Sequence, residues 1–176
     1  MSLLPECFSS QCAFRNSRLG FDQTNIQERQ GSIHYLQCLL PCCDAIWSAD
    51  EFEPEVDVEQ CLLLNEIPRC PYCGGTARPN VLMRGDRQWL EHRQADQAAR
   101  LSTWLTRVKK PVVIEIGADN VNSSLRGYSS LIAHDYSARL VRINPRNSSV
   151  PTNLDVGLGS GAKFALTEID RLIQSG

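Results

Sequence analysis

The sequence has no long apolar run, no marked excess of charge of either sign, no internal repeat and no low-complexity segment. No apolar run approaches the ~18 residues of a membrane span, so we expect no membrane association. The 18 Lys and Arg and the 20 Asp and Glu leave a net charge of −2, which gives no general attraction to nucleic acid. Residues 1–6 contain neither a basic region nor a long apolar stretch, so we expect no secretory signal. These absences predict a cytoplasmic globular protein.

Cysteine, by contrast, is abundant, and two close pairs stand out among the eight cysteines. The first pair is Cys38-Leu-Leu-Pro-Cys42, and the second, Cys70-Pro-Tyr-Cys73-Gly-Gly, follows after 27 residues. Two thiolates on each of two tight turns can surround Zn²⁺ as a tetrahedron with Zn–S bonds of roughly 2.3 Å. Proline presets φ inside the second turn, and the glycines after it accept positive φ. We therefore expect a zinc site in a reducing cytosol rather than a disulfide framework.

The remaining cysteines leave one alternative open. Cys43 adjoins Cys42 and can replace it as a ligand, although we favour Cys42. Cys7, Cys12 and Cys61 have no paired spacing and are left over. A site with four protein ligands has no open position for water or substrate, so the zinc is expected to be structural and the function to lie elsewhere.

The apolar pattern predicts strands around the cysteine pairs and an α/β alternation after them. We expect strands over 33–40 and 78–83, and a half-exposed strand over 50–59, where six acidic residues alternate with apolar ones. These carboxylates are most simply a solvated face; a face that attracts lysine-rich peptide is the alternative. Helices over 86–108, 123–133 and 162–173 alternate with strands over 112–116 and 139–143. The predicted fold class is α/β: a partial doubly wound, Rossmann-like parallel sheet with an inserted small four-cysteine zinc-ribbon module.

Ligands of such sheets bind at the carboxyl ends of the strands, where loops and helix N-termini present backbone N–H groups. Gly117, Asp119 and Asn144 fall at these ends. The segment Val156-Gly-Leu-Gly-Ser-Gly161 also resembles a phosphate-binding loop. The chain ends before the acidic residue of a dinucleotide fingerprint is due, so a turn at a helix entry is the simpler interpretation.

Several stretches, in order, resemble the sirtuin family of NAD-dependent protein deacylases. Gly31-Ser-Ile-His-Tyr-Leu-Gln-Cys38 is similar to the segment between the family's catalytic His-Gly and its first zinc cysteine, and the two cysteine pairs match its zinc ligands. Arg78-Pro-Asn-Val-Leu-Met-Arg-Gly-Asp86 resembles its Arg-Pro-x-Val-Val-x-Phe-Gly-Glu. Ile116-Gly-Ala-Asp119 stands where the family has Gly-Thr-Ser, and Ile143-Asn144 matches its Ile-Asn. The resemblance covers residues 8–170 and is closest to bacterial members that carry Gly-Ala-Gly in place of Gly-Thr-Ser.

This resemblance implies roles for parts of the chain. Residues 1–32 would be a remnant of the nucleotide-binding domain, 33–82 the zinc-binding module, and 83–176 the C-terminal part of the Rossmann-like NAD-binding domain. NAD contacts are implied for Gln11, Gly117, Asp119 and Asn144. In the family, the residue that matches Asn144 contacts the adenosine ribose. An acylated-lysine peptide would pair by main-chain hydrogen bonds, as strand addition predicts, with Val81, Met83 and Gly85. The implied reaction removes the acyl group from lysine and releases nicotinamide and an O-acyl-ADP-ribose.

Departures from the family pattern bear on activity. Gln30 stands at the position of the catalytic histidine, and glutamine has no nitrogen that titrates near pH 7 and cannot act as a base. His34 would lie about 13 Å further along a strand and is interpreted as an ordinary polar histidine. Gln11 and Ala13 replace the family's Asn and Asp at the nicotinamide ribose, and Arg84 replaces its Phe. The family's Gly-Ala-Gly-x-Ser loop, which cradles the pyrophosphate, has no counterpart here.

We therefore expect a protein of the deacylase type with weak or no activity of its own. The alternatives are a non-catalytic module that binds NAD, ADP-ribose or peptide, and a zinc-stapled scaffold fragment. Half of a doubly wound sheet leaves an apolar edge and face uncovered, so we also expect self-association.

Overall fold

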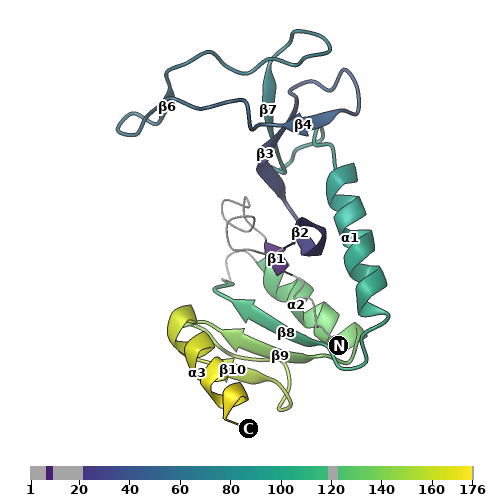
Figure 1. Cartoon of the computed structure of the whole chain (residues 1–176), viewed down its shortest axis with the longest axis vertical. Helices are drawn as coiled ribbons and strands as arrows, with labels where there is room; N and C mark the ends of the chain where they lie inside the picture. The colour runs from purple at the N-terminus through teal and green to yellow at the C-terminus, as the bar shows by residue number, and fades with distance from the viewer. Residues whose placement is uncertain (1–6, 10–21, 119–122, 176) are drawn as a thin grey trace. The chain divides into compact units, whose positions relative to one another are not determined.

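The computed structural model describes residues 7–9, 22–118 and 123–175 (Figure 1). The chain divides into two compact units, residues 1–103 and 104–176. The boundary falls near the end of helix α1 (His92–Leu105). Within the described ranges, no helix is both long enough and apolar enough to cross a membrane.

The first unit begins with two short parallel strands. β1 (Cys7–Ser9) pairs with β2 (Ile26–Glu28), and the short 3-10 helix η2 (Gln23–Asn25) leads into β2. The Asp22 carboxylate caps this helix by accepting the Thr24 N–H at 2.9 Å. All of β2 is buried. The turn that follows carries Gln30 directly into the next strand.

Three antiparallel strands form the main sheet of this unit. β3 (Gly31–Cys38) lies between β4 (Ile46–Ser48) and β7 (Ala77–Val81). The register pairs Cys38 with Ala77, which brings the ends of the two cysteine segments to the same end of the sheet. At the other end Gly31 pairs with Val81 and has a φ of +77°, and a Cβ there would lie 2.0 Å from the Asn80 carbonyl oxygen. Only glycine fits this close approach.

The acidic segment is not the half-exposed strand over 50–59 that its alternation predicts. Only Val56–Asp57 is extended as β5, and it pairs with Leu62–Leu63, which is β6, in an isolated hairpin. Neither strand joins the main sheet. The prediction is wrong because alternation is typical of a strand with one covered face, whereas Val56, Leu62 and Leu63 are all exposed and no described sheet or helix covers the hairpin.

Helix α1 begins at His92 and not at Asp86 as predicted. Side chains of the sheet hold the preceding segment out of a helix. The Asp86 carboxylate binds Arg78 at 2.6 Å and the Gln88 N–H at 3.0 Å. Buried Asn80 donates to the Leu90 carbonyl at 2.9 Å. These long-range bonds compete with the local bonds that a helix over 86–91 would need.

The second unit is a parallel α/β sheet. Strands β8 (Val112–Ile116), β9 (Arg139–Ile143) and β10 (Val156–Leu158) lie in the order β10-β9-β8, with α2 (Ser123–Asp135) between β8 and β9 and α3 (Ala162–Gln174) after β10. The α/β class and the partial parallel sheet are thus confirmed. β10 lies where the sequence was interpreted as a turn. Only glycine fits at position 157 of this strand, because a Cβ there would lie 2.1 Å from the Ser148 carbonyl oxygen.

The two faces of this sheet differ. Val113 and Leu140 are buried on the face that α2 covers, together with Ile132 of that helix. On the opposite face of β8 every second residue is exposed: Val112, Ile114 and Ile116. The apolar sheet face that the sequence predicted is therefore present in this unit.

Candidate functional site

Four thiols converge at the end of the main sheet where β3 ends and β7 begins. Cys38 ends β3, Cys42 lies in the turn after it, and Cys70 and Cys73 lie on the loop before β7. Their Sγ atoms all lie within 4.8 Å of one another, with 3.7 Å between Cys38 and Cys73 and between Cys42 and Cys70. A tetrahedral ion with bonds of roughly 2.3 Å to sulfur has S–S edges of about 3.8 Å. The spacing therefore fits an ion at the centre.

The second cysteine pair sits on a tight loop with its own bonds. The Cys70 N–H donates to the Gly75 carbonyl at 2.7 Å, and the Gly74 N–H donates to the Cys70 carbonyl at 2.9 Å. Gly74 has a φ of +71°, which glycine adopts without strain. Tyr72 inside the pair meets the ring of Trp47 on β4 edge to face, with centroids 6.3 Å apart. The Tyr72 contact thus joins the loop to β4 of the main sheet.

The thiols differ in how readily they ionise. Burial opposes ionisation of Cys70, but N–H groups of Tyr72 and Cys73 and neighbouring thiols outweigh it, and its pKa is lowered to about 7. The thiol of Cys42 has its pKa raised, first by its hydrogen bond with Cys73 and then by burial. One thiol of the group thus ionises readily, whereas a metal ion is needed to hold all four as thiolates.

The other cysteines of the described residues lie outside this group. The Cys43 sulfur is 3.7 Å from that of Cys42 but is not among the four converging atoms. Cys61 is exposed in the turn of the β5–β6 hairpin with a φ of +54°. Within the part of the chain that the structure describes, no other group of three or more His, Cys, Asp or Glu side chains can hold a metal ion. Two buried and two exposed sulfurs make a closed, four-ligand centre.

Gln30 and the segment assigned to peptide lie side by side. The Leu82 N–H donates to the Gln30 carbonyl at 2.9 Å, and β7 ends just before, at Val81. Met83 is exposed, and its carbonyl accepts the Asp86 N–H at 3.1 Å in a turn that includes Gly85 at a φ of +74°. This exposed turn therefore borders the position that the resemblance gives to the catalytic base.

Gly117 and Asn144 meet at the carboxyl edge of the parallel sheet. The Gly117 N–H donates to the Ile143 carbonyl at 3.0 Å, and Gly117 has a φ of +69°. Buried Asn144 donates to the Ala118 carbonyl at 2.9 Å, and its Oδ1 accepts the N–H groups of Arg146 and Asn147 at 2.9 and 3.0 Å. Its side chain thus joins the loops after β8 and β9. The other two residues predicted to contact NAD, Gln11 and Asp119, lie outside the described residues.

A buried ion pair behind this edge was not predicted. Glu115 and Arg142 occupy paired positions on β8 and β9, with Arg142 Nε 2.6 Å from Glu115 Oε1 and Nη2 3.0 Å from Oε2. The Ser129 hydroxyl of α2 also donates to Glu115. In the sequence, each charge stands one residue before the end of its strand, which is the one signal that relates them. The pair lies on the face of the sheet under α2, and Arg142 also donates to the carbonyl of Ser149 in the loop after β9.

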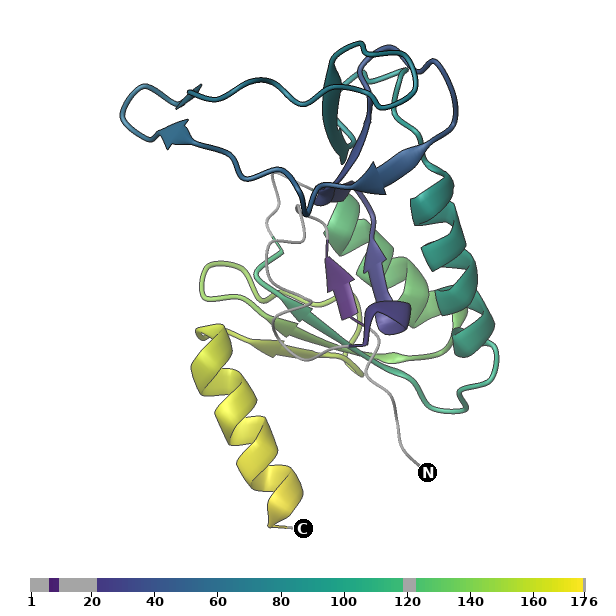
Figure 2. The same cartoon turned by 45° about the horizontal axis from the view of Figure 1, so that its top comes forward.

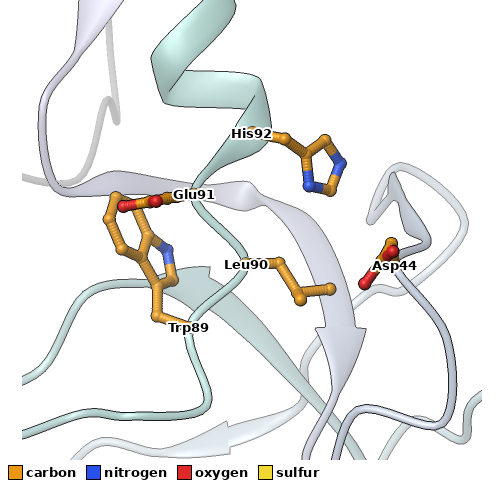
Figure 3. A pocket seen from close by; sticks show the side chains of 5 residues that line it. All are labelled: Asp44, Trp89, Leu90, Glu91 and His92. Atoms are coloured by element: carbon orange, nitrogen blue, oxygen red, sulfur yellow. The ribbon is translucent and has the colours of Figure 1, made fainter.

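The first unit also has an open pocket of about 470 Å³ (Figure 3). It is lined by Asp44, Trp89, Leu90, Glu91 and His92. Figure 3 shows Leu90 and His92 on the side of Asp44, with Glu91 beside the Trp89 ring. None of the residues predicted to bind NAD, peptide or metal lines this pocket.

Comparison with solved structures finds the same fold in several proteins. A Sir2 homologue in complex with NAD matches with a TM-score of 0.65 and 18% identity, over 96% of this chain and 57% of that chain. A mutant Sir2 homologue in complex with ADP ribose matches with a TM-score of 0.63 and 19% identity, over 96% and 59% of the two chains. Sir2Tm bound to a propionylated peptide matches with a TM-score of 0.59 and 16% identity, over 93% and 62%.

No protein-family model matches the chain, and no curated protein matches it by sequence. The chain spans less than two thirds of the length of the solved structures named above. The likeness extends over nearly all of its own residues, 93–96% of the chain in these three comparisons. The chain therefore has a sirtuin-like fold and corresponds to part of the length of those solved chains.

Proposed function

We propose that this chain is a zinc-stabilised, sirtuin-like binding module for the adenosine part of NAD or ADP-ribose and for an extended acyl-lysine peptide. The reaction class to which it is related is NAD-dependent removal of an acyl group from lysine, and the chain on its own is weakly active or inactive. The observation that carries this proposal is the place of Gln30. By the resemblance, Gln30 stands at the position of the family's base, and its carbonyl accepts the Leu82 N–H beside the exposed turn after β7. Loss of a general base lowers rates by about 10²–10⁴.

The sheet edge supports nucleotide binding. A Cβ at Gly117 would meet no atom within 4 Å, so the backbone there is open to a ligand. Three of the four hydrogen-bonding positions of Asn144 are engaged within the chain. One amide hydrogen is left for a ribose hydroxyl. We therefore expect weak, adenosine-directed affinity, since the pyrophosphate cradle of the family has no counterpart in this sequence.

Calorimetric titration tests binding separately from catalysis. ADP-ribose and AMP should both give heat at millimolar concentration, and AMP should compete with ADP-ribose, whereas nicotinamide should give none. Absence of heat with ADP-ribose would refute the binding proposal.

A nicotinamide-release assay with NAD and an acetyl-lysine peptide tests catalysis. The chain as it stands should release nicotinamide no faster than the spontaneous reaction. Gln30→His restores a titratable nitrogen, and Gln30→Asn is its matched control, because asparagine keeps the amide. Rapid release by the unsubstituted chain would contradict the proposed role of Gln30.

We infer that the ion of the four-cysteine centre is Zn²⁺. Thiolates select zinc over the hard cations, and a closed tetrahedral S₄ set is typical of structural zinc. When bound, the ion would neutralise the thiolates and join the two cysteine segments; it has no open position for a substrate. Elemental analysis should give one zinc per chain.

The exposed aliphatic face of β8 supports a further part of the proposal, which is self-association. Val112, Ile114 and Ile116 line this face with exposed Val156 of β10. Contiguous apolar surface of this kind favours association. Light scattering should show a mass that rises with concentration, and a constant monomer mass would contradict this inference.

A further inference from the structure

The β5–β6 hairpin stands apart from the main sheet of its unit. Figures 1 and 2 both show it projecting away from β3, β4 and β7. Its aliphatic side chains are exposed, by 50% at Val56, 53% at Leu62, 65% at Leu64 and 85% at Val58. Aliphatic residues that cover no core are typical of an interaction surface when they lie together.

The hairpin is nevertheless held in shape by its own hydrogen bonds. The Leu64 N–H donates to the Glu55 carbonyl at 2.8 Å. Asn65 accepts the Glu55 N–H at 3.2 Å and donates to the Glu53 carbonyl at 2.8 Å. The Asp57 carboxylate closes the turn by accepting the Glu59 and Gln60 N–H groups at 2.9 and 3.0 Å. A partner would therefore meet a preformed surface, which lowers the entropy lost on binding.

One face of the hairpin combines a row of carboxylates with a row of leucines. The register pairs Asp57 with Leu62, and the bond between Leu64 and Glu55 continues it. Directly opposed residues of an antiparallel pair point to the same face. Glu55 and Asp57 on one strand therefore stand beside Leu64 and Leu62 on the other, and Val56 and Leu63 share the opposite face.

The charge of this segment is one-sided. Residues 50–68 contain seven carboxylates and no Lys, Arg or His. Within the described ranges, none of these carboxylates forms an ion pair. Like charges repel the phosphates of nucleic acids and of anionic membranes, so the surface selects a cationic polypeptide.

We propose that the hairpin, residues 53–65, docks an extended segment of a partner protein in which Lys or Arg alternates with aliphatic residues. Backbone bonds would add the segment to the outer edge of β5. Its cationic side chains would then stand beside the carboxylate row, and its aliphatic side chains, which point to the opposite face, would stand beside exposed Val56 and Leu63. This inference concerns a surface separate from Gln30 and the nucleotide edge, and it does not depend on the function proposed for them.

The test uses the zinc-loaded full chain and a fluorescein-labelled peptide in which lysine alternates with valine, read by anisotropy. The control peptide has glutamate in place of lysine. The lysine peptide should bind and should bind more weakly as salt rises, since exposed charge pairs are screened. No binding by the lysine peptide, or equal binding by the glutamate peptide, would overturn the proposal.

Two pairs of substitutions locate the site. Glu55→Gln together with Glu53→Gln, the carboxylate two residues before it in the sequence, should weaken binding roughly three- to tenfold, the effect of two exposed ion pairs. The control pair on α3, Glu168→Gln with Asp170→Asn, removes as much charge from another part of the chain and should leave the affinity unchanged. Equal effects of the two pairs would overturn the proposal.

A third pair tests the aliphatic contact on the opposite face. Val56→Thr with Leu63→Thr introduces β-forming residues and should weaken binding roughly tenfold through lost apolar burial. Zinc content and thermal transition should stay unchanged in every variant, because the hairpin covers no core. Self-association that the hairpin substitutions abolish would instead identify a second copy of this chain as the occupant and overturn the assignment to a partner protein.

Discussion

Replacing Cys70 by serine tests the metal centre most directly. Cys70 is buried, and its sulfur lies 3.7 Å from that of Cys42, as in a tetrahedron of thiolates. Structural zinc contributes about 10–16 kcal/mol in small modules. An equal share for each of four ligands is roughly 3 kcal/mol, which corresponds to a factor of about 10² in affinity. This is a large part of the 5–15 kcal/mol that stabilises an ordinary domain, so we expect Cys70→Ser to lose metal and to unfold the strands around the centre.

The assay combines metal analysis, Co²⁺ substitution and thermal unfolding. The unsubstituted chain should bind one ion per chain, and its Co²⁺ form should show the strong visible absorption of tetrahedral thiolate coordination. Cys43→Ser and Cys61→Ser are matched controls, because they remove the same group outside the centre. If Cys70→Ser retained the ion and melted like Cys61→Ser, the reasoning would be refuted. If Cys43→Ser lost the ion, Cys42 would be the wrong ligand.

Three further predictions concern stability. Glu115→Ala leaves the buried guanidinium of Arg142 without its partner and should lower the free energy of unfolding by about 3–5 kcal/mol in urea titrations, whereas replacing both residues by methionine should cost little. Gly31→Ala should destabilise by roughly 2–5 kcal/mol, since it combines positive φ with a backbone clash, and Gly127→Ala, in open space on α2, should be neutral or stabilising. Burial opposes the charge of Asp86, but its hydrogen-bond donors and its ion pair outweigh burial and lower its pKa. The stability that this carboxylate contributes is present above about pH 4 and is lost as pH falls through the lowered pKa. Asp86→Asn should therefore reduce the loss of stability on the acid side.

Local pattern was sufficient where the residues that determine an element lie within it. The runs Val112–Ile116 and Arg139–Ile143 are strands, and 162–173 falls within helix α3. The cysteine pairs were recognisable for the same reason, since each is contained in one turn. Their convergence depends on a long-range register, Cys38 opposite Ala77, that spacing alone does not show.

Pattern was insufficient where distant residues compete with local bonding. The start of α1 is delayed because Gln37 on β3 donates to the Gln88 carbonyl at 2.7 Å and accepts the Leu90 N–H at 3.1 Å. The ion pair of Glu115 and Arg142 was missed because an isolated strand sequence does not tell which neighbour a charge will face. The alternation over 50–59 was misread because a period of two predicts a covered face only where a second layer exists.

The four-cysteine centre holds together the two ends of the long segment between Cys42 and Cys70. After β4 the chain between Ser48 and Cys70 leaves the main sheet and returns to it at this centre, and the hairpin within this stretch contributes nothing to the buried interior. Its length and composition can therefore change without altering the register of β3 against β7. A segment of this kind can acquire a new recognition specificity while the rest of the molecule keeps its structure, provided that the four-cysteine centre is retained.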